Sequence, residues 1–220
     1  MIRNIIFYLS LFVLLCGQAA ASSDHEIALF NSKGEPVAYI AVDDDYTIYL
    51  WGGKPVAYLY RHSNNIHIYS FNGDHLGWFE DGIIRDHDGN AVGFKKDTVK
   101  KPTQLEPLKG LRELKPLKSL RELPPLKPLF TSRWSKIPLE VYLTFGKCEP
   151  AILVKDFDGD KIIILRLNDE AWVLEAKTWC SWSWKYEGKI VWIKFSYTTT
   201  EVMNDDGDIS EFWTEREIHY

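Results

Sequence analysis

Between residues 27 and 94, short runs of β-branched and aromatic residues alternate with polar turns, and this pattern repeats four times. Each copy opens on an isoleucine-led run, turns on a glycine and leaves through a second apolar run. Several turns carry Asn-Gly, Asp-Gly or Gly-Gly pairs, which tolerate the positive φ that tight hairpins require. One hairpin cannot bury a face alone, so the sequence predicts four hairpins packed on one another. The turn glycines are Gly34, Gly53, Gly73 and Gly89.

A small residue occupies the middle of every outgoing strand. Strand alternation places it on the face opposite the flanking Val or Leu and aromatic positions. Glycine inside a strand costs stability unless a close approach requires it. We therefore expect this column to face a crowded pseudo-fourfold axis instead of solvent. Its members are Ala38, Ala57, Gly77 and Gly93.

Four segments of the repeat, GEPVAYI, YLWGGKPVAYL, FNGDHLGWFE and DHDGNAVGF, resemble the bacterial 4-fold β-flower domain. The Pro/Leu/Lys-rich tail and the LFTSRWSKIPLEVYL stretch are similar to the segments that come after that domain in relatives. The resemblance covers residues 27–143. It implies four β-hairpins about a pseudo-fourfold axis, and it brings no catalytic residues with it.

Residues 1–21 have the pattern of a secretory signal peptide, with Arg3 before an apolar run at 5–16 and small residues at 19–21. The apolar run is shorter than the ~20 residues of a membrane span. A lipid anchor at Cys16 is the alternative, but Leu15 stands where such a motif has a small residue. We expect cleavage, no transmembrane span, and a periplasmic or secreted mature protein whose four-hairpin domain covers residues 22–95.

Two cysteines, Cys148 and Cys180, remain after the signal peptide. An even number of cysteines in an oxidising compartment predicts a disulfide between them. Two free thiols are the alternative.

Residues 96–133 form a basic Pro/Leu-rich linker with a nine-residue period, PLKGLRELK, PLKSLRELP and PLKPL. The stretch from Lys95 to Lys136 carries a net charge of +8 and the remainder of the chain −13. Proline at each repeat start excludes a continuous helix and leaves short helical turns or polyproline-II segments as the options. Leucines at every third position predict a face laid along a groove of the β domain.

Two interpretations of the linker's bases stay open. They contact the protein's own acidic domains, or they clamp an anionic polymer. Nucleic acid is disfavoured, because no aromatic residue precedes Phe130 to stack on bases. The candidate polyanion contacts are Lys109, Arg112, Lys118 and Arg121.

Residues 134–220 predict a second small β-sandwich or barrel-like domain. One hairpin is expected from strands at 151–154 and 161–167, another around Glu187-Gly188, and a last strand at 209–218. Cys180, Trp182 and Trp184 alternate with serines, so they would share one strand face. That face is either core or a flat platform that stacks on sugar rings.

Candidate catalytic or metal chemistry is sparse. Asp156, Asp158 and Asp160 imitate a calcium loop, but the glycine and glutamate positions hold Lys161 and Leu167. We expect no metal site, and no histidine pair at ligand spacing among His62, His67, His75 and His87. The Asp86-His87-Asp88 run is assigned to a hairpin turn. No nucleophile elbow, P-loop or zinc-protease motif is present, so we expect no cofactor and no enzyme.

These features indicate a non-catalytic binding or structural module of the cell envelope, with a polysaccharide or a protein as partner. The alternative is a carbohydrate- or anionic-polymer-binding protein. A hydrolase with an unrecognised site is the third hypothesis, and it requires carboxylates and a histidine to converge in one cleft.

Overall fold

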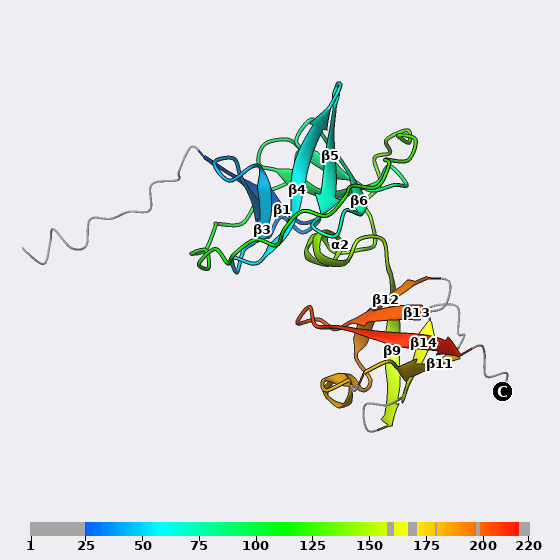
Figure 1. The fold of residues 1–220 in the computed structure, drawn as a ribbon. Coiled ribbons are helices and arrows are strands. Elements are labelled where there is room, and N and C mark those ends of the chain that lie inside the picture. Colours follow the sequence, from blue (N-terminus) through cyan, green and yellow to red (C-terminus); the bar gives the residue numbers. More distant parts are fainter. Residues whose placement is uncertain (1–24, 158–160, 167–170, 179, 197–198, 216–220) are drawn as a thin grey trace, which may run out of the picture.

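The computed structural model describes residues 25–157, 161–166, 171–178, 180–196 and 199–215. Within these ranges the chain forms two closed antiparallel β-barrels, connected by an extended segment and one short helix (Figure 1). No helix in this described part is long and apolar enough to cross a membrane. The all-β prediction with a second barrel-like domain is confirmed.

The first barrel has eight strands in sequence order, and it closes where β1 pairs with β8. Its four hairpins are β1–β2, β3–β4, β5–β6 and β7–β8, as the repeat predicted. Each hairpin has a register shift at the same place near its turn. The strands are β1 (Glu26–Phe30), β2 (Pro36–Ala41), β3 (Thr47–Leu50), β4 (Pro55–His62), β5 (Asn65–Ser70), β6 (His75–Glu80), β7 (Ile83–Arg85) and β8 (Ala91–Lys95).

Alternation along these strands separates an aliphatic interior from an aromatic outer face. The interior cluster includes Ile48 and Ile68, both fully buried. Outside the barrel wall, aromatic residues pair across neighbouring hairpins, with ring centroids 5.6–6.1 Å apart. These outer rings are also buried, so another part of the chain must cover them. The pairs are Tyr39–Tyr49, Tyr58–Tyr69 and Phe30–Phe94.

Helix α2 (Leu139–Phe145) lies between the two barrels (Figure 1). Its Leu139, Tyr142 and Leu143 belong to the core of the first barrel, and the Tyr142 hydroxyl donates to the backbone carbonyl of Leu76. Its opposite face, through Val141 and Phe145, packs on Trp192 and Met203 of the second barrel. Helix α2, which we assigned to the second domain, therefore packs on both barrels.

The column of small residues lies in the interior of the first barrel. Ala38 and Ala57 are fully buried there. A Cβ added to Gly93 would overlap the side chain of Leu139, and one added to Gly77 would overlap the backbone oxygen of Arg85. Helix α2 thus supplies part of the crowding at this column, and sequence reasoning did not place a helix there.

The extended segment 96–133, here called the strap, follows the four hairpin turns in order. Its backbone N–H groups donate to the carbonyls of the turn glycines at steps of nine residues, so one sequence repeat corresponds to one hairpin. The prolines that start the repeats fall between these steps, where no N–H is needed. The bonds run from Gln104 to Gly34 (2.8 Å), Glu113 to Gly53 (2.9 Å), Glu122 to Gly73 (2.9 Å) and Thr131 to Gly89 (3.0 Å).

The basic side chains of the strap from Lys109 to Lys127 face the barrel and contact its carboxylates or its outer rings. Lys109 and Arg112 pair with Glu26 at 2.8 and 2.5 Å, and both lie over the ring of Tyr39. Further along, Lys115 pairs with Asp44 at 2.5 Å, and its hydrogen bond lowers the pKa of that carboxyl group. The strap is therefore attached by backbone hydrogen bonds, ion pairs and cation–π contacts.

The other two candidate polyanion contacts are engaged in the same way. Lys118 lies 4.4 Å from the ring centroid of Tyr58 and approaches Asp45 at 4.0 Å. The guanidinium of Arg121 lies 3.8 Å from the ring centroid of Tyr60. Bases that could have contacted a polymer are thus directed at the protein's own surface.

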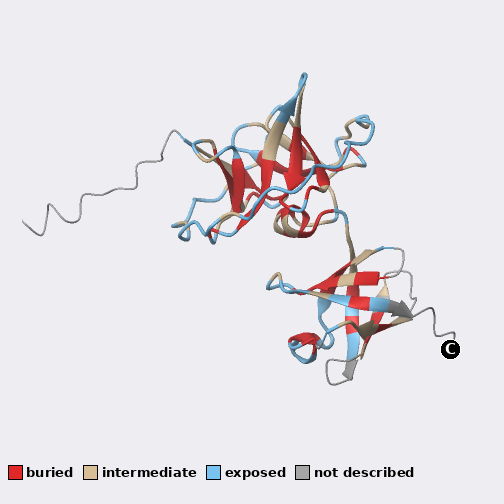
Figure 2. Cartoon of the chain, viewed as in Figure 1, coloured by how far each residue is buried: buried red, intermediate tan, exposed pale blue. Residues whose placement is uncertain are grey.

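The prediction that the leucines lie in a groove is wrong. All nine point to solvent with 90–98% of their surface exposed, and Figure 2 shows most of the strap as exposed. A chain with roughly three residues per turn presents three faces. Backbone donors and basic side chains occupy the two faces toward the barrel, so the leucines take the third. They are Leu105, Leu108, Leu111, Leu114, Leu117, Leu120, Leu123, Leu126 and Leu129.

The orientation of the strap predicts different effects on stability for substitutions at Arg112 and at Leu114. Arg112→Gln should lower the free energy of unfolding by about 1 to 2 kcal/mol, because it removes ion pairs and a cation on two tyrosine rings. Leu114→Ser should change it by less than about 0.5 kcal/mol, because that side chain contacts little. Urea denaturation of both variants measures the difference. A larger loss for Leu114→Ser than for Arg112→Gln would contradict the strap's orientation.

The second barrel has six strands in the order β10-β11-β14-β13-β12-β9. The predicted hairpin of β9 and β10 is confirmed, although its turn lies outside the described residues. The hairpin predicted around Glu187-Gly188 is wrong, because residues 183–186 form the 3-10 helix η1 (Ser183–Tyr186). The strands are β9 (Glu149–Phe157), β10 (Lys161–Arg166), β11 (Ala171–Ala176), β12 (Ile190–Phe195), β13 (Thr199–Met203) and β14 (Ile209–Glu215).

The predicted disulfide is also wrong, since Cys148 and Cys180 are both free thiols. Cys180 is buried in the core of the second barrel. Cys148 packs beside α2 in a separate cluster, where burial raises the pKa of its thiol to about 12. The fold therefore uses the two residues as core side chains in different places.

Cys180, Trp182 and Trp184 do not lie on one strand face. Trp182 is 7% exposed and belongs to the barrel core, whereas Trp184 is 62% exposed on the 3-10 helix. A strand would have placed both rings on one side. The two tryptophans do not form one flat platform.

Candidate functional site

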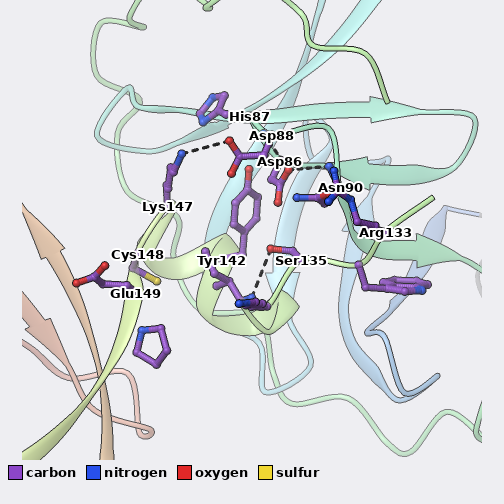
Figure 3. A pocket seen from close by; sticks show the side chains of 14 residues that line it. Asp86, His87, Asp88, Asn90, Arg133, Ser135, Tyr142, Lys147, Cys148 and Glu149 are labelled. Carbon is purple, nitrogen blue, oxygen red and sulfur yellow. Dashed lines mark hydrogen bonds and ion pairs between the residues drawn. The ribbon is translucent and has the colours of Figure 1, made fainter. Parts of the chain in front are cut away.

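A cavity of about 530 Å³ lies beside α2, where the two barrels approach each other. We call it the cleft (Figure 3). Its walls come from the β7–β8 turn, the end of the strap, α2 and the segment that leads into β9. The residues that Figure 3 labels are Asp86, His87, Asp88, Asn90, Arg133, Ser135, Tyr142, Lys147, Cys148 and Glu149.

The β7–β8 turn is held by its own first carboxylate. Oδ1 of Asp86 accepts the backbone N–H groups of Asp88 and Asn90 at 3.0 and 2.8 Å. Gly89 follows with φ of +80°, a conformation that favours glycine. The Asp-His-Asp run thus forms a hairpin turn, as predicted, and this turn presents its polar side chains to the cleft.

The strap's end forms a second wall. Arg133 and Ser135 exchange backbone hydrogen bonds with Ala91 of β8, which fixes the chain between them. The ring of Trp134 contacts the edge of Phe94, with centroids 5.8 Å apart, and Nζ of Lys101 lies 4.9 Å from its centroid. An aromatic side chain is therefore held in position at the cleft.

Charged groups around the cleft differ in how far they are paired. Asp88 pairs with Lys147 at 3.4 Å, and Glu149 pairs with Arg166 at 2.6 Å. Within the part of the chain that the structure describes, the side chains of Arg133 and Lys136 have neither an ion pair nor a hydrogen bond. The cleft thus has two cations available and its carboxylates already occupied.

Tyr142 of α2 forms the floor of the cleft and points toward the turn (Figure 3). Burial raises the pKa of its hydroxyl well above the ordinary value, so it stays protonated. Its proton is already donated to the carbonyl of Leu76. Tyr142 is therefore a structural side chain and not an acid or base available to a ligand.

Three histidines form a hydrogen-bonded chain that ends at the cleft. Nδ1 of His67 lies 3.0 Å from Nε2 of His75, and Nδ1 of His75 lies 2.9 Å from Nε2 of His87. His87 lines the cleft, and His67 lines a smaller cavity of about 250 Å³ under the strap. The chain thus connects two cavities along the outer face of the barrel.

Sequence reasoning missed this chain, because it found no histidine pair within reach. His75 lies opposite Tyr69 across the β5–β6 hairpin, which makes it a diagonal neighbour of His67. Such neighbours are close enough for large side chains to touch. Counting the hairpin register from Gly73 could have found that pair, but His87 joins from the next hairpin.

The chemistry of this chain is that of neutral histidines. Burial lowers the pKa of all three, and that of His75 falls to about 3 with the charges of His87 and His67 as lesser causes. Each neutral ring donates through one nitrogen and accepts through the other. The tautomer of one ring therefore determines the tautomers of the other two.

Among the described residues, no group of three or more His, Cys, Asp or Glu side chains is arranged to hold a metal ion. Asp158 and Asp160 of the calcium-loop pattern lie outside those residues. Asn204, Asp206 and Asp208 have the same spacing as that pattern, but they belong to a hairpin turn in which the Asp208 N–H donates to Asn204 Oδ1 at 2.9 Å.

The first barrel, its strap and α2 define a class of protein in which four hairpins close into a barrel and a nine-residue repeat follows their turns. The family model described as "4-fold beta flower protein" matches residues 27–143, more than half of the chain. The chain belongs to this family. The match ends inside α2, so it includes the strap. No curated protein and no solved structure matches this chain significantly.

Proposed function

We propose that this protein is an exported, non-catalytic binding module of the cell envelope and that its ligand occupies the cleft. The supporting observation is that polar side chains of both barrels converge there around an open cavity. The strap's bases are a poorer candidate site, because Lys109, Arg112, Lys118 and Arg121 already contact the barrel. Export rests on the signal-peptide pattern of residues 1–21.

A segment of envelope polysaccharide fits the character of the cleft. Its volume of about 530 Å³ lies in the range of small-ligand sites. Such sites combine aromatic and aliphatic walls with a few polar groups that fix orientation. The cleft has Trp134 and Ile137 for the first role, and Asn90 and Ser135 for the second.

A hydrolase is the second candidate, because Asp86, His87, Asp88 and Glu149 do line one cleft. Their partners argue for binding instead. Asp86 holds the turn, Asp88 is paired with Lys147, and His87 shares a hydrogen bond with His75. A free carboxylic acid or an activated nucleophile would be needed for hydrolysis.

Co-sedimentation of the mature chain with insoluble peptidoglycan tests the proposal. We expect binding that Asn90→Ala weakens by about tenfold, because that change removes a polar side chain that fixes the orientation of the ligand in the cleft. Asn64→Ala is the matched control, an exposed turn amide outside the cleft, and it should bind like the parent chain. Binding that both variants keep, or that neither the parent nor the variants show, would refute the cleft as the site.

A further inference from the structure

From Lys109 to Lys136, a basic residue stands at every third position except Pro124 and Phe130. Each of those from Lys109 to Lys127 contacts a carboxylate or an aromatic ring of the protein. Arg133 and Lys136 continue the same spacing, nine residues after Pro124 and Lys127, yet no such partner reaches them within the described residues. The contacting bases are Lys109, Arg112, Lys115, Lys118, Arg121 and Lys127.

At several basic positions of the strap, the cation contacts both a carboxylate and an aromatic ring. Glu26 and the ring of Tyr39 serve Lys109, and Glu80 and the ring of Phe130 serve Lys127. At the cleft, a ring is present in Trp134, between the two cations in sequence. The carboxylate is the component that is not supplied there.

The carboxylates of the cleft cannot fill this place without breaking existing contacts. Asp86 accepts two backbone N–H groups, and Glu149 is held by Arg166 at 2.6 Å. Asp88 is paired with Lys147 on the other side of the cavity (Figure 3). Two cations that face a cavity without a partner favour an anionic ligand there.

From these observations we infer that Arg133 and Lys136 bind a carboxylate of the ligand. The inference rests on the proposed function and names the substrate class of the same cleft, an acidic sugar such as a uronic acid. The planar guanidinium of Arg133 matches a carboxylate through two parallel hydrogen bonds, and Lys136 adds a point charge. A neutral sugar would leave both cations unpaired.

Calorimetric titration of the full mature chain with D-glucuronate, D-glucose and glucose 6-phosphate tests the inference. We expect glucuronate to bind at least tenfold more tightly than glucose, and its affinity to fall with added salt. Arg133→Gln and Lys136→Gln should each cost about tenfold in glucuronate affinity. Lys96→Gln, which changes an exposed cation outside the cleft, should cost nothing.

The outcomes separate this inference from the function on which it rests. Equal affinity for glucose and glucuronate, or a glucuronate affinity unchanged by Arg133→Gln, would overturn the carboxylate assignment. Tighter binding of glucose 6-phosphate than of glucuronate would overturn it in favour of phosphate. Failure to bind glucuronate would refute it alone if the chain still co-sediments with peptidoglycan through the cleft. Failure of both experiments would refute the proposed function as well.

Discussion

Gly77→Ala is expected to lower the free energy of unfolding by more than about 3 kcal/mol, or to prevent folding. The added Cβ would overlap the backbone oxygen of Arg85 and would lie 2.9 Å from the Tyr142 hydroxyl. Neither neighbour can move easily, because one is strand backbone and the other is a buried side chain of α2. The backbone φ of Gly77 is not positive, so the effect is steric and not conformational.

Gly52→Ala is the matched control for this substitution. A Cβ at Gly52 meets no atom within 4 Å, and its φ is not positive either. We expect its effect on unfolding to stay within about 0.5 kcal/mol. Guanidinium denaturation of both variants, followed by tryptophan fluorescence, measures the difference. Similar effects of the two substitutions would show that the small column is not a point of close contact with α2.

The second large effect is a loss of stability in acid that arises from His75. In the unfolded chain its pKa is about 6.5, whereas in the fold burial lowers it to about 3. Between these two values the unfolded state binds a proton that the folded state does not. This group therefore does not reduce the free energy of unfolding above pH 6.5, and it reduces it increasingly as the pH drops toward 3. At pH 4.0, about 2.5 units below the pKa of the unfolded chain, the loss should reach about 3 kcal/mol, given roughly 1.4 kcal/mol per unit.

Several groups face His75 and contribute to this behaviour. His67 and His87 bond to its two nitrogens, the rings of Tyr69 and Trp78 pack beside it, and Glu122 of the strap accepts its backbone N–H at 2.6 Å. Among the described residues, no carboxylate forms an ion pair or a hydrogen bond with the His75 ring. A positive charge on the His75 ring would thus be poorly stabilised by the groups around it.

Urea denaturation at pH 7.5, 5.0 and 4.0 measures the effect. His75→Gln removes the group with the largest shift and should make the pH dependence shallower over this range, leaving the smaller contributions of His67 and His87. His62→Gln changes an exposed histidine outside the chain of three and should leave the slope unchanged. A parent slope equal to that of His75→Gln would mean that His75 is not the group responsible.

The sequence predicts the four hairpins well because their signals are local. Isoleucine-led runs and turn pairs such as Asn72-Gly73 act within a few residues, and the repeat confirms each copy by the others. The local pattern does not determine the orientation of the strap, because leucine at every third position is compatible with a buried face and with an exposed face. The choice depends on where Arg112 and its equivalents find partners on strands far away in sequence.

Non-local packing also explains the errors at the site and in the second barrel. Helix α2 has seven residues and few capping signals, and its place between the barrels decides which residues form the cleft. An even number of cysteines in an oxidising compartment predicted a disulfide, but the fold packs Cys148 and Cys180 into separate clusters. The alternation around Trp182 is typical of a strand, whereas the chain forms a 3-10 helix there.

Hydrogen–deuterium exchange of the full mature chain, with and without soluble peptidoglycan fragments, tests most directly whether the ligand occupies the cleft. We expect slower exchange in the β7–β8 turn and in residues 133–150, which form the walls of the cleft. We expect no change around Leu114 on the strap or around Trp184 on the second barrel. Protection that appears at either of those surfaces, with the cleft unchanged, would contradict the assignment of the cleft as the ligand site.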